Sequence, residues 1–114
     1  MRSLSDLEKK TLINIGNNAK YVRRVLLGVT LEDMAKITDV SRDVLCRLEA
    51  MSSAIDPNRS YPSITTVIKF CDHIGVTPAE LFESDFSEVS FIRGKILEHC
   101  SDYIGESSFV VKSK

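Results

Sequence analysis

Residues 31–49 (LEDMAKITDVSRDVLCRLE) constrain the fold more than any other segment of this chain. Small, apolar and capping residues fall where two short helices joined by a tight turn require them: Ala35, Val40, Ser41, Leu45 and Leu48. Ala35 allows the second helix to cross close above the first, and Val40 fills the corner between them. Ser41 can accept a hydrogen bond from a backbone N–H and so start the second helix. The segment therefore predicts a helix-turn-helix, a motif whose second helix lies in the DNA major groove.

The same residues resemble the Cro/cI-type (Xre family) helix-turn-helix regulators. The resemblance is carried by Met34-Ala35, by Thr38 to Ser41 and by Leu45 to Glu49, and it continues through Tyr61-Pro62-Ser63 and 74–82. It covers about residues 12–83. It implies an all-α fold: a five-helix, lambda-repressor-like DNA-binding domain. Two positions depart from the family pattern, since Leu31 replaces a glutamine that contacts the DNA backbone and Asp39 replaces a glycine in the turn.

Apolar periodicity and capping residues support five helices independently of the resemblance. Apolar residues spaced by three and four between Leu12 and Val29 predict a helix, and Gly28 fits its C-terminus. Thr30 caps a helix that runs to about 38, and Ser41 one over 42–50. Ser63 begins a helix that ends at Gly75, and Thr77 followed by Pro78 begins the fifth.

The last thirty residues lie outside the family pattern, so we divide the chain into a DNA-binding domain (1–84) and a C-terminal element (85–114). Asp85 and Glu88 suggest a capping box for a sixth helix over about 86–104. One face of that helix is an apolar stripe: Val89, Ile92, Ile96, Cys100 and Tyr103. We expect this stripe to form a homodimer interface, with the helix or the 106–114 tail open to a further protein partner.

Composition is compatible with a DNA-binding protein but does not demand one. The net charge is −1, with 11 Lys/Arg and 9 Asp/Glu in residues 1–75 and an acidic remainder. DNA affinity depends on local charge, so such a chain can still bind. No apolar run approaches membrane-spanning length, no secretion signal is evident, and three cysteines suit reduced thiols. We expect a cytoplasmic protein of bacterial or phage origin.

The resemblance assigns DNA contacts to the first, second and sixth positions of the second helix, which are Arg42, Asp43 and Arg47. Arginine can bond guanine bidentately, and aspartate can accept from cytosine or orient an arginine. Phosphate contacts are expected from Thr30 at a helix N-terminus and from Arg59 in the loop, with Arg23 and Arg24 as further candidates. The predicted DNA-binding set is Thr30, Ser41, Arg42, Asp43, Cys46, Arg47 and Arg59.

No motif supports catalysis, a cofactor or a metal site. The Cys71/His73 and His99/Cys100 pairs lack zinc-ligand spacing, and a redox role for Cys46 lacks a neighbour that would lower the pKa of its thiol. The leading hypothesis is a sequence-specific regulator, a repressor, that binds a palindromic operator as a homodimer. The alternative is a protein-interaction module, antitoxin-like or anti-repressor, that uses the same fold without reading bases.

Overall fold

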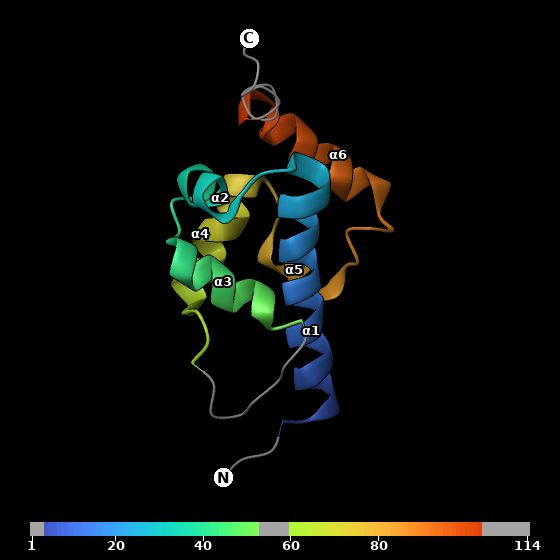
Figure 1. Ribbon diagram of the computed structural model, residues 1–114. Coiled ribbons are helices and arrows are strands. Elements are labelled where there is room, and N and C mark those ends of the chain that lie inside the picture. Colours follow the sequence, from blue (N-terminus) through green and yellow to red (C-terminus); the bar gives the residue numbers. More distant parts are fainter. Residues whose placement is uncertain (1–3, 53–59, 104–114) are drawn as a thin grey trace.

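The computed structural model describes residues 4–52 and 60–103, and these residues are helical with short connections. The elements in chain order are α1 (Asp6–Tyr21), η1 (Val22–Leu27), α2 (Leu31–Thr38), α3 (Arg42–Ala50), α4 (Ile64–Ile74), α5 (Pro78–Glu83) and α6 (Ser90–His99). In Figure 1, α1 and η1 form one long rod, α2 to α4 lie beside it, and α6 crosses its upper end. The expected all-α fold, with a helix added after the five-helix domain, is confirmed.

Hydroxyl side chains start five of these helices. Each accepts a hydrogen bond from the backbone N–H three residues on: Ser5, Thr30, Ser41, Ser63 and Thr77. The last four caps are confirmed predictions. The Ser5 cap was not expected, and together with Glu8 it forms a capping box. Consequently α1 begins at Asp6, six residues before the predicted start, because reciprocal side-chain bonds satisfy N–H groups that the helix leaves unpaired.

The C-terminal end of the first rod is wider than an α-helix. Residues Val22–Leu27 form the π-helix η1, which ends at Gly28 in the left-handed conformation (φ 63°). The Val29 N–H closes the end by bonding the Arg23 carbonyl at 3.0 Å. A π turn inserts an extra residue in the helical period, so side chains beyond it point in new directions. Sequence periodicity predicted a helix here and not its wider turn.

The core is built around α1, which packs against both α3 and α5. Its buried side chains include Ile15 and Ala19, and they join Val22 of η1 and apolar side chains from every other helix. Asn18 is also buried, and its amide donates to the carbonyls of Leu81 (2.9 Å) and Ser84 (2.7 Å). These bonds satisfy carbonyls left free where α5 ends, so a polar side chain is buried without an unpaired group.

The expectation for the sixth helix needs two corrections. First, α6 begins at Ser90, because the Asp85 carboxylate accepts from the backbone N–H and the hydroxyl of Ser87 in a turn and does not form the expected capping box with Glu88. Asp side chains commonly bond two residues on, which favours a turn over a helix start. Second, α6 ends at His99. Residues 104–114, including the predicted tail, lie outside the described part.

The apolar stripe of α6 is used within one protomer. Ile92, Ile96 and Cys100 are each at most 3% exposed and belong to the same core cluster as α1. Val89 is half-buried against that core, and Tyr103 is 40% exposed. Three of the five residues expected at a dimer interface are therefore packed in the protomer's own core, whereas Tyr103 stays exposed. Ile96→Glu would disrupt the core and not simply separate two subunits.

Within the described residues, no helix is long and apolar enough to cross a membrane.

Candidate nucleic-acid interface

The corner between α2 and α3 has the geometry that the sequence predicted. Asp39 adopts the left-handed conformation (φ 58°) in the turn, and Val40 is buried behind it. Lys69 of α4 donates to the Asp39 carbonyl at 3.0 Å, and its ammonium lies 3.7 Å from the Asp39 carboxylate. An aspartate is thus tolerated where glycine would be easiest, because a neighbouring helix ties the turn down.

The corner divides α3 into a buried and an exposed face. Leu45 and Leu48 are each 1% exposed and anchor the helix to the core. Arg42, Asp43 and Cys46 lie on the exposed face, and the Arg47 side chain is 41% exposed. The first two turns of α3 therefore present the residue types predicted for base contact, as a helix entering the major groove requires.

Both arginines of this face have a carboxylate partner. Arg42 Nε lies 3.0 Å from Oε2 of Glu32 in α2, and Arg47 Nη1 lies 3.7 Å from Oδ2 of Asp43 one turn earlier. The side chains remain largely exposed, so these pairs are weak and exchangeable. Within the described part of the chain, Arg47 Nε is buried and lacks a hydrogen-bond partner. Asp43 thus neighbours Arg47, as expected, whereas Glu32 was not foreseen.

The N-terminus of α2 lies at the other side of the corner. Thr30 is exposed, and its hydroxyl accepts from the Asp33 N–H at 3.1 Å while keeping its own O–H for a further acceptor. Leu31, the departure from the family glutamine, is half-buried against the core. Ser41 similarly caps α3 by accepting from the Val44 N–H. Arg59, the predicted loop contact, lies outside the described residues.

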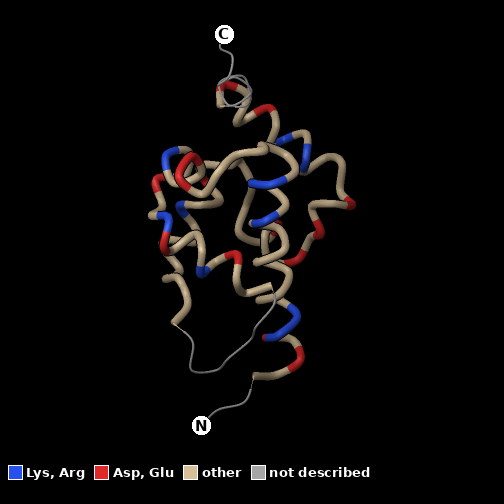
Figure 2. Tube along the Cα trace, viewed as in Figure 1, with Lys and Arg blue, Asp and Glu red and all other residues tan. Residues whose placement is uncertain are grey.

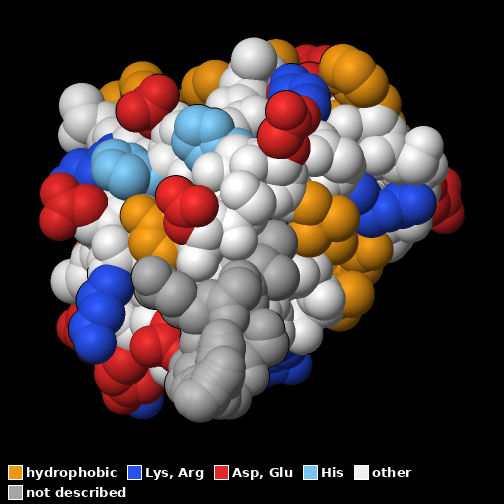
Figure 3. Space-filling model, turned by 90° about the horizontal axis from the view of Figure 1, so that it is seen from above, with side chains coloured by type: hydrophobic (Ala, Val, Ile, Leu, Met, Phe, Trp, Pro, Cys, Tyr) orange, Lys and Arg blue, Asp and Glu red, His pale blue; other side chains and the backbone are white. Residues whose placement is uncertain are grey.

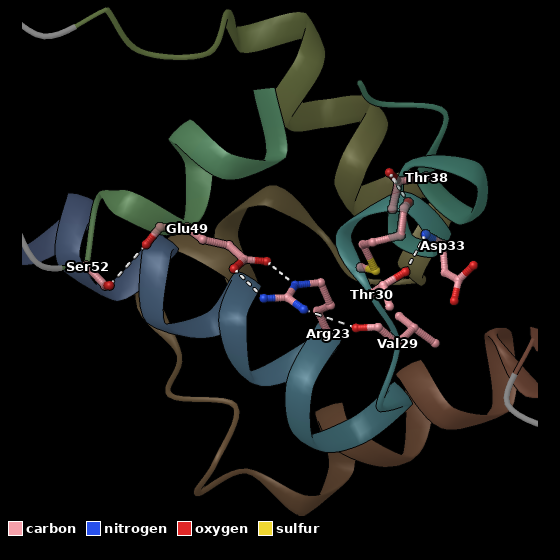
Figure 4. A network of polar contacts seen from close by, with 8 residues as sticks. Arg23, Val29, Thr30, Asp33, Thr38, Glu49 and Ser52 are labelled. Carbon is pink, nitrogen blue, oxygen red and sulfur yellow. Dashed lines mark hydrogen bonds and ion pairs between the residues drawn. The ribbon is translucent and has the colours of Figure 1, made fainter. Parts of the chain in front are cut away.

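A partly buried ion pair joins α3 to η1 (Figure 4). Arg23 Nε and Nη2 donate to the two carboxylate oxygens of Glu49 at 2.7 and 3.0 Å, and Arg23 Nη1 donates to the Val29 carbonyl at 3.0 Å. The hydrogen bond to Glu49 is the main cause that raises the pKa of Arg23. Because Arg23 is committed to this pair, it fixes the position of α3 and is not available as the phosphate contact considered from sequence.

Charges of both signs surround the exposed face of α3. Figure 2 shows Lys or Arg alternating with Asp or Glu along α2 and α3. A shallow hollow of about 330 Å³ lies over the outer face of α3, lined by Asp43, Cys46, Arg47, Ala50 and Ser60. A surface of this kind attracts DNA less at long range than a uniformly basic one, so contacts at short range must supply more of the affinity.

The three cysteines differ in environment. Cys46 is exposed on α3, whereas burial raises the pKa of Cys71 and of Cys100 to about 11. The two buried thiols are core residues, as their apolar positions in the sequence suggested. No group of three or more potential metal ligands occurs among the residues for which side chains are described.

Sequence reasoning missed the residues that hold the interface in place. Glu32, Glu49 and Lys69 are ordinary charged residues in the sequence, and their partners lie 10, 26 and 30 positions away. Only Glu49 offered a local indication in the sequence, because it directly follows the apolar Leu48 at the end of the motif. The structure buries both residues. A charged residue at the inner edge of an apolar pattern indicates a buried partner but does not identify it.

Comparison with known families agrees with this geometry. The model of one family, described as a Cro/C1-type HTH DNA-binding domain, matches residues 26–87, which is more than half of the chain. The matched region starts within η1 and includes the whole α2–α3 corner, α4 and α5. No curated protein and no solved structure matches the chain significantly.

Proposed function

The chain belongs to the Cro/C1-type helix-turn-helix DNA-binding family, and from that premise we propose that it is a transcriptional repressor that binds a palindromic operator as a homodimer. Family membership supports the broader statement that the chain is a DNA-binding regulator. The repressor role, the operator symmetry and the two copies are our proposal. One observation carries the proposal. The buried face of α3 packs on the core, and its exposed face bears Arg42 and Arg47, whose ion pairs with carboxylates are exposed and weak.

Arg42 and Arg47 are the proposed base readers. On entering the groove, each guanidinium would exchange its carboxylate for acceptors on a base edge, and O6 and N7 of guanine fit it best. Arg47 has a further reason to gain a partner, because its buried Nε is unpaired in the described structure. Asp43 and Cys46 stand on the same face, where Asp43 would accept from cytosine or hold Arg47 in position.

The N-terminus of α2 is the proposed phosphate contact. Thr30 is exposed there, and the first N–H groups of a helix favour an anion. Leu31 offers no polar contact beside it, so Thr30 and the backbone would act without the side chain that the family often uses. Arg59, which follows α3 in the sequence, remains a proposed phosphate contact.

Two copies are proposed because one short helix contacts few base pairs. Specific binding at physiological salt usually combines two half-sites about one helical turn (~34 Å) apart, and two-fold protein symmetry then requires a palindromic site. A small protein that occupies such a site excludes other proteins sterically, and repression needs nothing more. The proposal places the protein in the cytoplasm of a bacterial cell, with the DNA that it would bind.

A second function is favoured by the acidic residues of the interface. Glu32 and Asp43 are exposed beside α3 and would face DNA phosphates, and the chain has a net charge of −1. The same mixed-charge surface suits a protein partner, as in an antitoxin-like or anti-repressor module.

Selection of bound sequences from a random DNA pool tests the proposal. We expect a palindromic consensus whose binding weakens steeply with salt. Arg42→Ala and Arg47→Ala should each relax the preference at one base pair per half-site and lose about 1–3 kcal/mol of discrimination. Lys9→Ala, which removes a charge from an exposed position near the start of α1, is the matched control and should keep the consensus. No enrichment at low salt would favour the protein-interaction module.

Glu32→Gln tests whether the carboxylate on α2 positions Arg42. The substitution keeps the size of the side chain but weakens the hold on the guanidinium, which now lies 3.0 Å away. We expect overall DNA affinity to rise, because an acidic charge leaves the interface, while the preference at the base pair read by Arg42 falls. If the variant selected the same base pair from the same DNA pool, Glu32 would have no role in positioning Arg42.

A further inference from the structure

The outer face of α6 carries a second apolar stripe, opposite the buried one. Phe91 is 72% exposed and Leu97 is 37% exposed, although both are large apolar side chains. Gly94 lies midway between them and is exposed, as are Ser90 and Glu98. Figure 3 views the molecule from above, the end where α6 lies, and shows hydrophobic side chains exposed there in several separate patches. We call Phe91, Gly94 and Leu97 the outer stripe.

Gly94 has no role within the protomer that explains its presence in a helix. Among the residues that the structure describes, nothing lies within 4 Å of the point where a Cβ atom would be, and its backbone φ is not positive. Alanine, for example, would fit there and would favour the helix more. A glycine at the centre of an exposed helix face instead allows another backbone to approach closely.

The start of α6 lacks a cap. Val89 precedes the helix, and its side chain makes no capping hydrogen bond, in contrast to the hydroxyl caps of α1 to α5. The first N–H groups of α6 carry partial positive charge and suit a carboxylate. Glu98 provides an exposed carboxylate eight residues later, near the other end of the same helix.

From these observations we propose that two copies of the chain pair through antiparallel α6 helices that cross at Gly94, with Phe91 of each copy packed against Leu97 of the other. This deepens the proposed function, on which the need for two copies rests. Phe91 and Leu97 lie three residues on either side of Gly94, so an antiparallel partner brings them to the same level. Glu98 and Ser90 lie four residues on either side, so each Glu98 carboxylate reaches the uncapped first turn of the partner helix.

Charge complementarity selects a second copy in this orientation. A parallel pair would place the two uncapped helix starts together and the two Glu98 carboxylates together, which is unfavourable at both ends. The antiparallel pair joins opposite charges twice and closes with two-fold symmetry. Lys95 lies 5.6 Å from the centre of the Phe91 ring and is tied to Glu80, so the ring is held in place before pairing. The contact is one short helix long, and we expect a dimer of micromolar affinity.

Disulfide cross-linking tests the position of the crossing. The experiment uses a Cys46→Ser background, which removes the exposed native thiol. Residue 94 lies on the proposed two-fold axis, so Gly94→Cys should form a disulfide-linked dimer in a buffer of reduced and oxidised glutathione. Ser90→Cys is the geometric control, because its two copies would be about 12 Å apart along the helices and beyond disulfide reach. Leu7→Cys on α1 is the exposure control. Cross-linking at Ser90 or Leu7 as fast as at Gly94 would overturn the proposal.

Sedimentation of the full chain provides the second test. Phe91→Glu should raise the dimer dissociation constant at least tenfold while the helical content stays unchanged, since the side chain is exposed. Leu7→Glu is the matched control, because Leu7 is 73% exposed on another helix. A Phe91→Glu dimer as tight as the wild type would refute the surface. If the wild-type chain is a dimer but selects no DNA, the dimer surface stands and the proposed function is refuted. If it is a monomer that selects a single half-site, only the proposed pairing of α6 helices is refuted.

Discussion

The ion pair between Arg23 and Glu49 should decide how firmly α3 is held. The two side chains are 12% and 10% exposed, and two short hydrogen bonds join them. Glu49→Gln keeps the shape but removes the negative charge, so the Arg23 guanidinium would remain charged and largely buried without a counterion. Arg23→Met makes the converse change and leaves the carboxylate unpaired.

The expected magnitude follows from the geometry. Two unit charges about 4 Å apart interact by about 4 kcal/mol at an effective dielectric constant of about 20. Removing one partner of a buried pair typically costs about 3–5 kcal/mol, which is a large part of the roughly 5–15 kcal/mol that stabilises a domain. The double variant Arg23→Met/Glu49→Leu removes both charges of this pair, so neither is left buried without its partner. It loses the bond from Arg23 to the Val29 carbonyl, so we expect it to cost only about 1 kcal/mol.

Urea unfolding followed by circular dichroism measures these values, with the protein concentration held constant because the proposed dimerisation would add stability. The double variant should be more stable than either single variant, which is the signature of a strongly coupled pair. Costs that simply add would show that the two charges do not interact, and the reasoning would fail. Lys69→Met is a control for a more exposed pair, and we expect a loss below about 1 kcal/mol.

Two further predictions concern titrating groups. Because burial raises the pKa of Cys71 and Cys100 to about 11, iodoacetamide at pH 8 should label only Cys46 in the folded protein and all three thiols after denaturation, as mass spectrometry would show. The hydrogen bond from Lys95 lowers the pKa of Glu80 in the folded protein. The ionised Glu80 therefore stabilises the fold at pH values above the usual glutamate pKa, and this stabilisation is lost as the pH falls through the lowered pKa. Lys95→Met should therefore lower the melting temperature at pH 7 but hardly change it at pH 2.

The corner and its caps were predictable because their determinants are local. Thr30, Ser41 and Thr77 act on groups three residues away, and Val40 fills the turn beside it. A single window of sequence contains both the cap and its partner, and the apolar spacing fixes which face of each helix is buried. The same holds for the left-handed Asp39, which the family pattern located and the φ of 58° confirms.

The arrangement of α6 was not predictable in the same way. Its buried stripe was visible in the sequence, but periodicity does not show whether a stripe meets its own core or another copy. Ile92 and Ile96 pack in the core that surrounds α1, and this placement follows only from the packing of all the helices. Likewise, no local sequence pattern distinguishes the π-helix η1 from an α-helix.

The carboxylates beside Arg42 and Arg47 bear on how such a protein would find its target. Each guanidinium would meet DNA with its charge already partly offset by a carboxylate, so an unrelated sequence would offer little net electrostatic attraction. Encounters with the wrong sequence would then be brief, and the search would proceed by repeated three-dimensional collisions more than by sliding along the duplex. Such a protein would spend less of its time bound to the rest of the genome.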